Sequence, residues 1–221
     1  MRRIRKGTEP PSLTTYREAN VAPLDWDRYL GKEEARQVAT TEQRQLCAFC
    51  QTSIAYKKRP MKLAHVVPQS DPTDGQRLAL TWTNIVGSCP GGEDTNRPRL
   101  LHCDSLQGSR RLSPSLDPVQ FVNGSLSYDA EGRVSISADE VQREINEILG
   151  LNTTELQRNR KAALQGLKEQ LATLPDRASK DQYQQNLLAE LDPDQSDHEP
   201  LRQYADFLLW HLRYGDLVGS A

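Results

Sequence analysis

Residues 46–70, LCAFCQTSIAYKKRPMKLAHVVPQS, join a pair of closely spaced cysteines to a short apolar stretch that contains one histidine. Cys47 and Cys50 are separated by two residues, a spacing that lets two thiolates of one tight turn bind the same tetrahedral ion at about 2.3 Å. The apolar residues around His65 are typical of a buried strand. The sequence therefore predicts a metal-binding turn followed by a strand that carries a histidine.

Two further cysteines lie C-terminal to this stretch, Cys89 and Cys103, and the chain has four cysteines in all. In a reducing compartment, cysteines are more often thiols or metal ligands than disulfides. We expect all four to bind one structural zinc ion, with His102 as an alternative ligand to Cys103. A redox-active CxxC motif is the rival interpretation, but the surrounding sequence does not resemble the βαβ context of such motifs.

The net charge differs between the two halves of the chain. Residues 1–112 contain 18 Lys and Arg against 12 Asp and Glu, a net charge of +6, and residues 113–221 contain 10 against 18, a net charge of −8. The first half is thus compatible with a polyanionic partner and the second is not. No apolar run of about 18 residues occurs, and the basic N-terminus lacks the apolar segment of a signal peptide. We expect a cytoplasmic protein without membrane contact.

The composition divides the chain into three parts. Residues 1–40 are expected to form an extended arm, either disordered or docked on a partner, followed by a helix from about Trp26 to Ala39. Residues 41–118 contain all four cysteines, five of the 13 Gly and seven of the 13 Pro, so this loop-rich part needs an internal staple. Residues 119–221 are expected to form a short β-hairpin and a helical domain.

The helices of the last part are predicted from apolar residues at helical spacing and from start and stop signals. In the first two, an acidic residue follows the expected cap by three positions, as in a capping box. The expected helices begin and end, in order, near Ser137 and Gly150, Asn152 and Leu174, Asp176 and Leu191, and after Asp197 and at Gly215. One apolar face on each indicates a small bundle, which we interpret as a scaffold or a partner-docking surface.

The order of motifs in residues 44–112 resembles that of the HNH, or ββα-metal, nucleases. The matching segments are His65-Val66-Val67-Pro68, Trp82-Thr83-Asn84-Ile85-Val86 and the segment from His102 to Gly108. The resemblance implies an α+β fold with a zinc-stapled ββα-metal module, in which Asn84 opens a helix. Residues 2–17, 116–134 and 145–160 are also similar to the PtuB-like HNH subunit of Septu anti-phage systems and its retron-associated relatives.

The resemblance also implies a catalytic site. A neutral imidazole can take a proton from the attacking water, so His65 is the candidate base. A divalent ion, Mg²⁺ or Mn²⁺, would neutralise charge on the phosphate and needs oxygen ligands. By resemblance, Asn84 helps to fix the base and the ion site, and Asp104 lies nearby with His102 as a further candidate. Ala64 stands where the family often has an acidic residue.

Two groups of basic residues flank the expected site. If the zinc ion draws their segments together, they would contact phosphates in a salt-sensitive manner, although ordinary surface charge explains each residue singly. The candidates are Lys57, Lys58, Arg59 and Lys62 before the strand, and Arg97, Arg99, Arg110 and Arg111 around the last cysteine.

These features predict an endonuclease that hydrolyses phosphodiester bonds, with DNA favoured. The resemblance implies a nuclease effector of Septu-like anti-phage defence in a hetero-oligomer with an ATPase subunit. The sequence has no Walker-type phosphate loop, so nucleotide dependence must come from another chain. Two alternatives stay open: a ribonuclease acting on structured RNA such as tRNA, and a non-catalytic zinc-containing binding subunit. His198 and His211, in the acidic half, are interpreted as structural.

Overall fold

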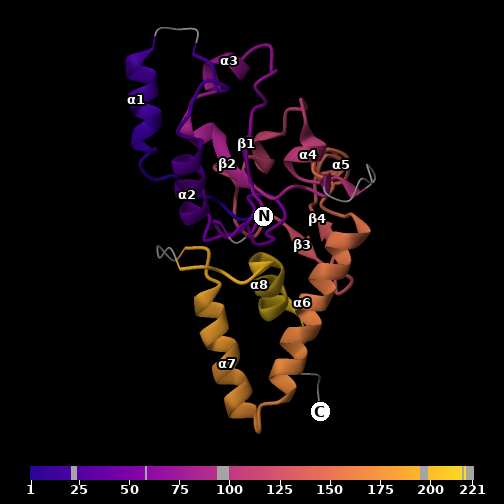
Figure 1. Cartoon of the computed structure of the whole chain (residues 1–221). Coiled ribbons are helices and arrows are strands. Elements are labelled where there is room, and N and C mark those ends of the chain that lie inside the picture. Colours follow the sequence, from indigo (N-terminus) through magenta and orange to yellow (C-terminus); the bar gives the residue numbers. More distant parts are fainter. Residues whose placement is uncertain (21–23, 58, 94–99, 195–198, 216, 218–221) are drawn as a thin grey trace.

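The protein is a mixed α+β structure, mostly helical, with two small antiparallel hairpins (Figure 1). A computed structural model describes residues 1–20, 24–57, 59–93, 100–194, 199–215 and 217. The first half contains α1 (Pro11–Ala19), α2 (Lys32–Glu42), β1 (Lys62–His65), α3 (Gly75–Leu78), β2 (Ile85–Ser88) and α4 (Asp104–Gln107). The second contains β3 (Ser127–Tyr128), β4 (Val134–Ser135), α5 (Asp139–Glu147), α6 (Thr154–Ala172), α7 (Arg177–Glu190) and α8 (Ala205–Tyr214). The predicted α+β class is confirmed.

The β1–β2 hairpin separates two apolar cores. The strands pair in antiparallel register, with His65 opposite Ile85. Neighbouring side chains on a strand point to opposite faces. Accordingly, Ala64 is buried in the larger core together with all four cysteines, and Leu63 packs against a smaller core that contains Trp26. The strand predicted around His65 is confirmed.

The larger core continues from the cysteines into the helical half. In Figure 1, α6 and α7 form a helical hairpin that projects from the body, and α8 lies between the ends of these helices that are nearest the body. The guanidinium of Arg160 on α6 is buried and donates hydrogen bonds to the backbone oxygens of Gly132, at 2.9 Å, and Leu151, at 2.8 Å. Arg160 thereby ties the β3–β4 turn to the helices.

The N-terminal residues differ from the expected extended arm. Met1 and Ile4 are buried in the larger core of their own chain, and residues 11–19 form α1. The ammonium of Lys6 is also buried: it lies 2.7 Å from the carboxylate of Glu42 and 3.5 Å from the ring centroid of Trp82. Few apolar residues in this segment signal its burial, because its contacts are to residues distant in sequence. The helix predicted from Trp26 begins only at Lys32.

The helix starts show where local signals hold and where they fail. Asp176 caps α7 as predicted, accepting a hydrogen bond from the Ser179 N–H at 2.8 Å. The cap predicted at Asn152 is wrong, since Thr153 occupies that position. Asn152 instead exchanges two side-chain hydrogen bonds with the backbone of Val134 on β4, at 2.8 and 2.9 Å. Its side chain therefore stabilises the hairpin.

Three more local predictions need correction. α5 is preceded by Ala138 and has no side-chain cap, so Ser137 does not form the expected capping box. α8 begins at Ala205, and the residues just after Asp194 lie outside the described part of the chain. Asn84 does not open a helix; it ends a 3₁₀ turn, Trp82–Asn84, and β2 follows directly.

No helix among the described residues is long and apolar enough to cross a membrane.

Two glycines with the same backbone conformation provide a test of the β3–β4 turn. Gly132 and Gly124 both have φ of +84°. A Cβ atom on Gly132 would lie 2.4 Å from the backbone oxygen of Gln157, whereas one on Gly124 would meet nothing within 4 Å. We expect Gly124→Ala to cost about 1–2 kcal/mol of unfolding free energy through its left-handed backbone alone, and Gly132→Ala to cost at least about 1 kcal/mol more.

Urea unfolding of the two variants measures this difference. Equal losses of unfolding free energy would show that the close packing of the turn against α6 does not exclude a side chain at position 132.

Candidate metal centre and histidine site

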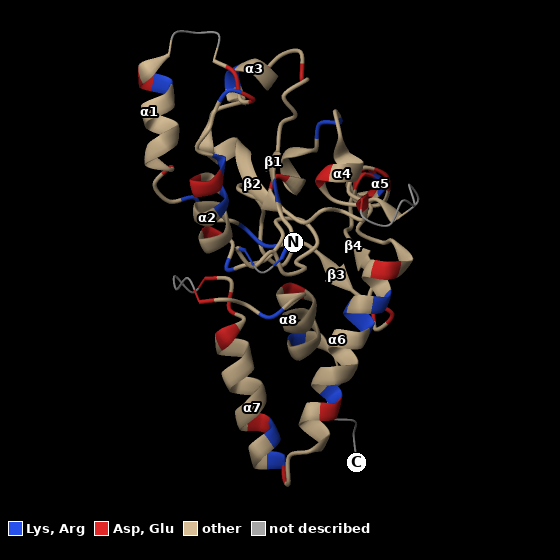
Figure 2. Ribbon diagram, viewed as in Figure 1, with Lys and Arg blue, Asp and Glu red and all other residues tan. Residues whose placement is uncertain are grey.

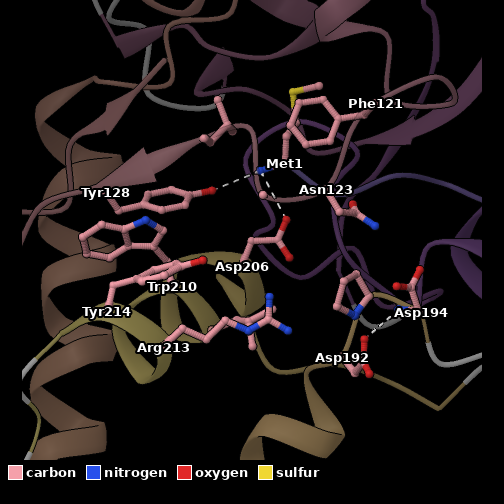
Figure 3. Close-up of a pocket in the computed structure, with 14 residues that line it drawn as sticks. Met1, Phe121, Asn123, Tyr128, Asp192, Asp194, Asp206, Trp210, Arg213 and Tyr214 are labelled. Atoms are coloured by element: carbon pink, nitrogen blue, oxygen red, sulfur yellow. Dashed lines mark hydrogen bonds and ion pairs between the residues drawn. The ribbon is translucent and has the colours of Figure 1, made fainter. Parts of the chain in front are cut away.

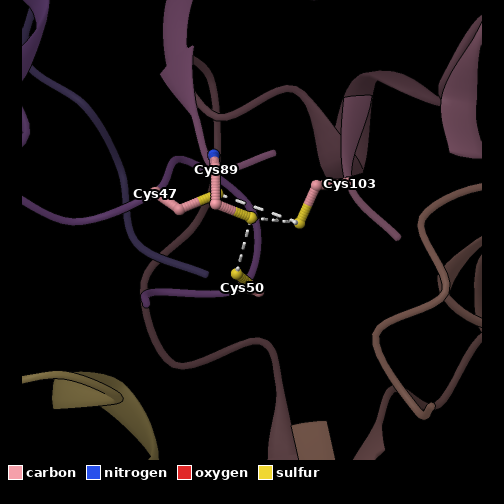
Figure 4. A group of neighbouring side chains, drawn as sticks. All are labelled: Cys47, Cys50, Cys89 and Cys103. Carbon is pink, nitrogen blue, oxygen red and sulfur yellow. Dashed lines mark hydrogen bonds between the residues drawn. The ribbon is translucent and has the colours of Figure 1, made fainter. Parts of the chain in front are cut away.

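The four cysteines converge on one point in the larger core (Figure 4). Their sulfurs all lie within 4.8 Å of one another, with Cys50 and Cys89 at 3.6 Å and the pairs Cys47–Cys103 and Cys89–Cys103 at 3.8 Å. A tetrahedron with 2.3 Å metal–sulfur bonds has edges of about 3.8 Å. The cluster is thus sized for a structural zinc ion, as the cysteine spacing predicts.

The backbone around the cluster fixes its geometry. The Cys89 N–H donates to the sulfur of Cys47 at 3.3 Å, and the Cys103 N–H donates to the backbone oxygen of Leu149 at 2.8 Å. Burial and the three neighbouring cysteines raise the pKa of the Cys103 thiol. Four thiolates in this space therefore require a cation to share their charge.

His102 lies beside the cysteine cluster. Its Nδ1 is 3.1 Å from the sulfur of Cys103 and 3.8 Å from that of Cys89. The imidazole is therefore directed at the sulfurs, where it can donate a hydrogen bond to a thiolate. The four cysteines form a complete tetrahedral set without it, so the geometry favours Cys103 over His102 as the fourth ligand.

His65 ends β1 and lies on the other side of the hairpin. Its imidazole is 8 % exposed, and its Nε2 is 2.9 Å from the backbone oxygen of Ala79. A carbonyl can only accept, so the proton of the neutral ring is on Nε2 and the lone pair is on Nδ1. Burial lowers the pKa of His65, which keeps the ring neutral at pH 7. The site thus holds a neutral histidine in a defined tautomer.

Nδ1, the second ring nitrogen of His65, has no hydrogen-bond partner among the described residues. The fully buried polar atoms without a partner do not include it, so this nitrogen retains some solvent exposure. This nitrogen can therefore accept a proton from a water molecule at the protein surface.

Asn84 holds the chain that follows His65. Its Oδ1 accepts a hydrogen bond from the Val67 N–H at 2.7 Å, and its Nδ2 donates to the backbone oxygens of Val67, at 3.0 Å, and Leu78, at 3.2 Å. Leu78 lies one residue before Ala79, which binds the His65 ring. Asn84 therefore fixes both segments that orient His65, which makes it a positioning residue.

The charges that act on His65 come from a segment that the sequence analysis does not assign to the site. The rings of Trp26 and His65 meet nearly at right angles, with centroids 4.8 Å apart. The carboxylate of Asp27 raises the pKa of His65 and the ammonium of Lys32 lowers it. These residues are 33 to 39 positions away in sequence and follow no motif, so only the tertiary structure reveals them.

Asp104 begins α4 directly after Cys103, and the described contacts do not bring it to His65. Burial raises the pKa of Asp104, Lys62 lowers it and Glu93 raises it. Lys62 and His65 are three residues apart on β1 and so face opposite sides of the strand. Within the described residues, the four cysteines are the only group of three or more metal-ligating side chains. Asp104 is thus a single candidate carboxylate for a divalent ion.

The candidate phosphate-binding residues are largely engaged in contacts within the chain. Lys62 pairs with Glu93, and Arg111 pairs with Asp71 and Asp74 at 3.4 and 3.0 Å. Arg110 donates to the backbone oxygens of Leu106, Gln107 and Glu147. Lys57 and Arg59 lie on the loop before β1, and Lys58, Arg97 and Arg99 lie outside the described residues. Figure 2 shows acidic and basic residues interspersed along the ribbon.

A separate cavity of about 180 Å³ lies near the N-terminus, against β3 and α8 (Figure 3). Phe121, Tyr128 and Trp210 contribute aromatic walls, and Asp206 pairs with the Arg2 guanidinium at 2.8 Å. The lining contains neither histidine nor cysteine. The cavity therefore does not contribute to the candidate site.

No protein-family model matches the sequence, and no curated protein matches it either.

Removal of a cysteine ligand tests the metal centre. We expect Cys103→Ser to lose bound zinc and the cooperative unfolding transition, because metal binding and folding are coupled in so small a core. His102→Ala should retain one zinc ion per chain, since the four sulfurs are left intact. Elemental analysis of the purified proteins and thermal unfolding followed by circular dichroism measure both effects.

Two results would contradict this assignment. One is a metal-free wild-type protein that unfolds at the same temperature as the metal-loaded protein. The other is loss of zinc in His102→Ala with retention in Cys103→Ser, which would exchange the roles of the two residues.

Proposed function

We propose that the protein is an HNH-type endonuclease in which His65 is the general base. The observation that carries the proposal is the fixed end of β1, where Asn84 binds the backbone of Val67 and the His65 ring is held through Nε2 with Nδ1 left to accept a proton. The surrounding order of elements supports it: a cysteine turn, the β1–β2 hairpin, then α4 directly after the last cysteine. This order is the one expected of a zinc-stapled ββα-metal module.

The reaction needs one proton transfer on each side of the phosphate. A water molecule gives its proton to Nδ1 of His65, and its oxygen attacks the phosphorus of the phosphodiester. The bond between phosphorus and the leaving sugar oxygen breaks, and that oxygen takes a proton from solvent. Asn84 contributes by fixing the backbone of Val67 and Leu78, which keeps the imidazole in one orientation.

A divalent ion, Mg²⁺ or Mn²⁺, would supply positive charge to the reacting phosphate. Asp104 offers one carboxylate, and Mg²⁺ often binds through one or two carboxylates with water and substrate phosphate completing its shell. His102 is engaged with the cysteine sulfurs, so Asp104 is the better of the two expected ion ligands. Asp104 interacts with Lys62, which faces the side of β1 opposite His65, so substrate phosphate would have to bridge the ion and the base.

The biological setting of the proposal rests on resemblance alone. The similarity to the HNH subunit of Septu systems supports an effector of bacterial anti-phage defence that acts in the cytoplasm on DNA. A hetero-oligomer with an ATPase subunit would supply the control by nucleotide that this chain's sequence lacks.

A plasmid-nicking assay with Mg²⁺ or Mn²⁺ tests the general base, and the chain offers a matched control. His211 is also buried, its Nε2 is 3.3 Å from the backbone oxygen of Asp129, and its ring also meets a tryptophan, Trp210. We expect His65→Ala to reduce the rate by about 10²- to 10⁴-fold. His211→Ala should retain the wild-type rate, provided that zinc content and folding are unchanged.

The pH dependence follows from the direction of the pKa shift. Because burial lowers the pKa of His65 below its usual 6.5, the base is neutral at and above that pH. The cleavage rate should therefore rise with pH below 6.5 and become constant before neutrality. A rate that rises only above pH 7 would exclude His65 as the titrating base.

The nucleic acid that the protein cleaves distinguishes a DNA endonuclease from the two alternative functions. Cleavage of structured RNA but not of DNA would make the protein a ribonuclease with the same base. No cleavage of either, with and without an ATPase partner, would favour a non-catalytic zinc module.

A further inference from the structure

The segment from Trp26 to Lys32 forms a wall of the His65 site. Trp26 contacts two groups: its ring meets the His65 ring at a centroid distance of 4.8 Å and nearly at right angles, and the Lys32 ammonium is 5.4 Å from its ring centroid. Lys32 and Asp27 are the two charged residues whose fields act on His65. An ammonium and a proton acceptor thus both lie against one tryptophan.

The backbone of this segment is held in place. Tyr29 is 1 % exposed, and its hydroxyl donates to the Gly31 oxygen at 3.0 Å. A Cβ atom on Gly31 would lie 2.2 Å from the hydroxyl oxygen of Ser12 on α1, so the chain passes too close to α1 for another residue. Lys32 follows directly as the first residue of α2. Its Cα is therefore fixed relative to the Trp26–His65 pair.

The Lys32 ammonium is only weakly paired among the described residues. Its ion pair is a 4.0 Å contact with Asp27, whose side chain is 89 % exposed, and such a pair adds little stability. The other lysines near the hairpin are more tightly bound: Lys6 lies 2.7 Å from Glu42, and Lys62 pairs with Glu93. Of these three, Lys32 is the one whose donors are least committed within the chain.

The charge of Lys32 does not stabilise the start of α2. A cation in the first turn meets the positive end of the helix dipole, which disfavours it by about 0.3–1 kcal/mol when exposed. The following Glu33 and Glu34 have the favourable sign, but Lys32 does not. Its presence at this position is better explained by an anion that it binds.

We propose that Lys32 binds the non-bridging oxygens of the phosphate that the His65-activated water attacks. This inference rests on the proposed function, and its ligand is a phosphodiester of a nucleic-acid backbone. A fixed ammonium beside the phosphate stabilises the negative charge that develops there as the water oxygen bonds to phosphorus. Lys32 transfers no proton; the proton of the water goes to His65, as in the proposed reaction.

Cleavage kinetics provide the first test. We expect Lys32→Met to lower kcat/KM by about 10²-fold, with zinc content retained and the unfolding temperature unchanged or raised. Lys32→Arg should recover part of the activity, because it restores the charge. The control is Lys161→Met, which removes a half-exposed lysine that pairs with Glu131 on the far side of the fold. Equal kcat/KM in wild type and Lys32→Met would overturn the proposal.

Two measurements keep this test independent of cleavage. A 12-base-pair DNA duplex, added without divalent ions, should bind Lys32→Met more weakly than wild type and more weakly than Lys161→Met. By NMR, Lys32→Met should raise the pKa of His65 and Asp27→Asn should lower it, because the two charges act in opposite directions.

The outcomes separate the two ideas. If wild type binds the duplex through Lys32 but cleaves no nucleic acid, the phosphate site stands and the catalytic role of His65 fails. If His65 is needed for cleavage but Lys32→Met neither weakens binding nor slows cleavage, the catalytic role of His65 stands and the phosphate site at Lys32 fails. No duplex binding by wild type would overturn the Lys32 proposal.

Discussion

The fold depends on four buried cysteines whose sulfurs surround a space sized for one metal ion. β1 and β2 are four residues each, and α4 is also four residues, lengths that do not form stable structure on their own. The cysteines connect these pieces: Cys47 and Cys50 come from the turn before β1, Cys89 directly follows β2, and Cys103 directly precedes α4. A metal ion bound at their centre would supply the stability that so small a hairpin cannot gain from buried hydrophobic area.

The rest of the chain is joined to this centre by a backbone hydrogen bond and by buried charged groups. The Cys103 N–H donates to the backbone oxygen of Leu149, just after α5, and Arg160 joins α6 to the β3–β4 turn. On the other side, Lys6 donates to the Ile85 oxygen at 2.9 Å while paired with Glu42; burial lowers the pKa of Lys6 to about 8. A buried cation is costly unless its hydrogen bonds are met. These contacts hold the N-terminal segment against the residue paired with His65, although they lie outside the site.

The parts predicted from sequence are those set by neighbours in the chain. Cys47 and Cys50 are recognised by their spacing, Asp176 by its place before a helix, and the His65 strand by its apolar residues. Asn152 was misassigned because its hydrogen bonds go to Val134, which local capping rules do not consider. Trp26 and Lys32 were missed for the same reason, since their relation to His65 exists only after α2 packs against the hairpin.

Two of the three histidines buried among the described residues, His65 and His211, show what marks a catalytic group. His65 and His211 each place Nε2 against a backbone oxygen, each meet a tryptophan ring, and burial lowers the pKa of both. This geometry is therefore a way to satisfy a buried imidazole, and by itself it indicates no reaction. His211 lies between Phe207 and Trp210 on a helix, whereas His65 ends a strand whose exit is fixed by Asn84. The case for His65 as a base rests on this fixed exit, because a proton acceptor must be held in one orientation toward the attacking water. Hydrolysis also needs a place for the phosphate, and the proposed role of Lys32 depends on the role of His65 in turn.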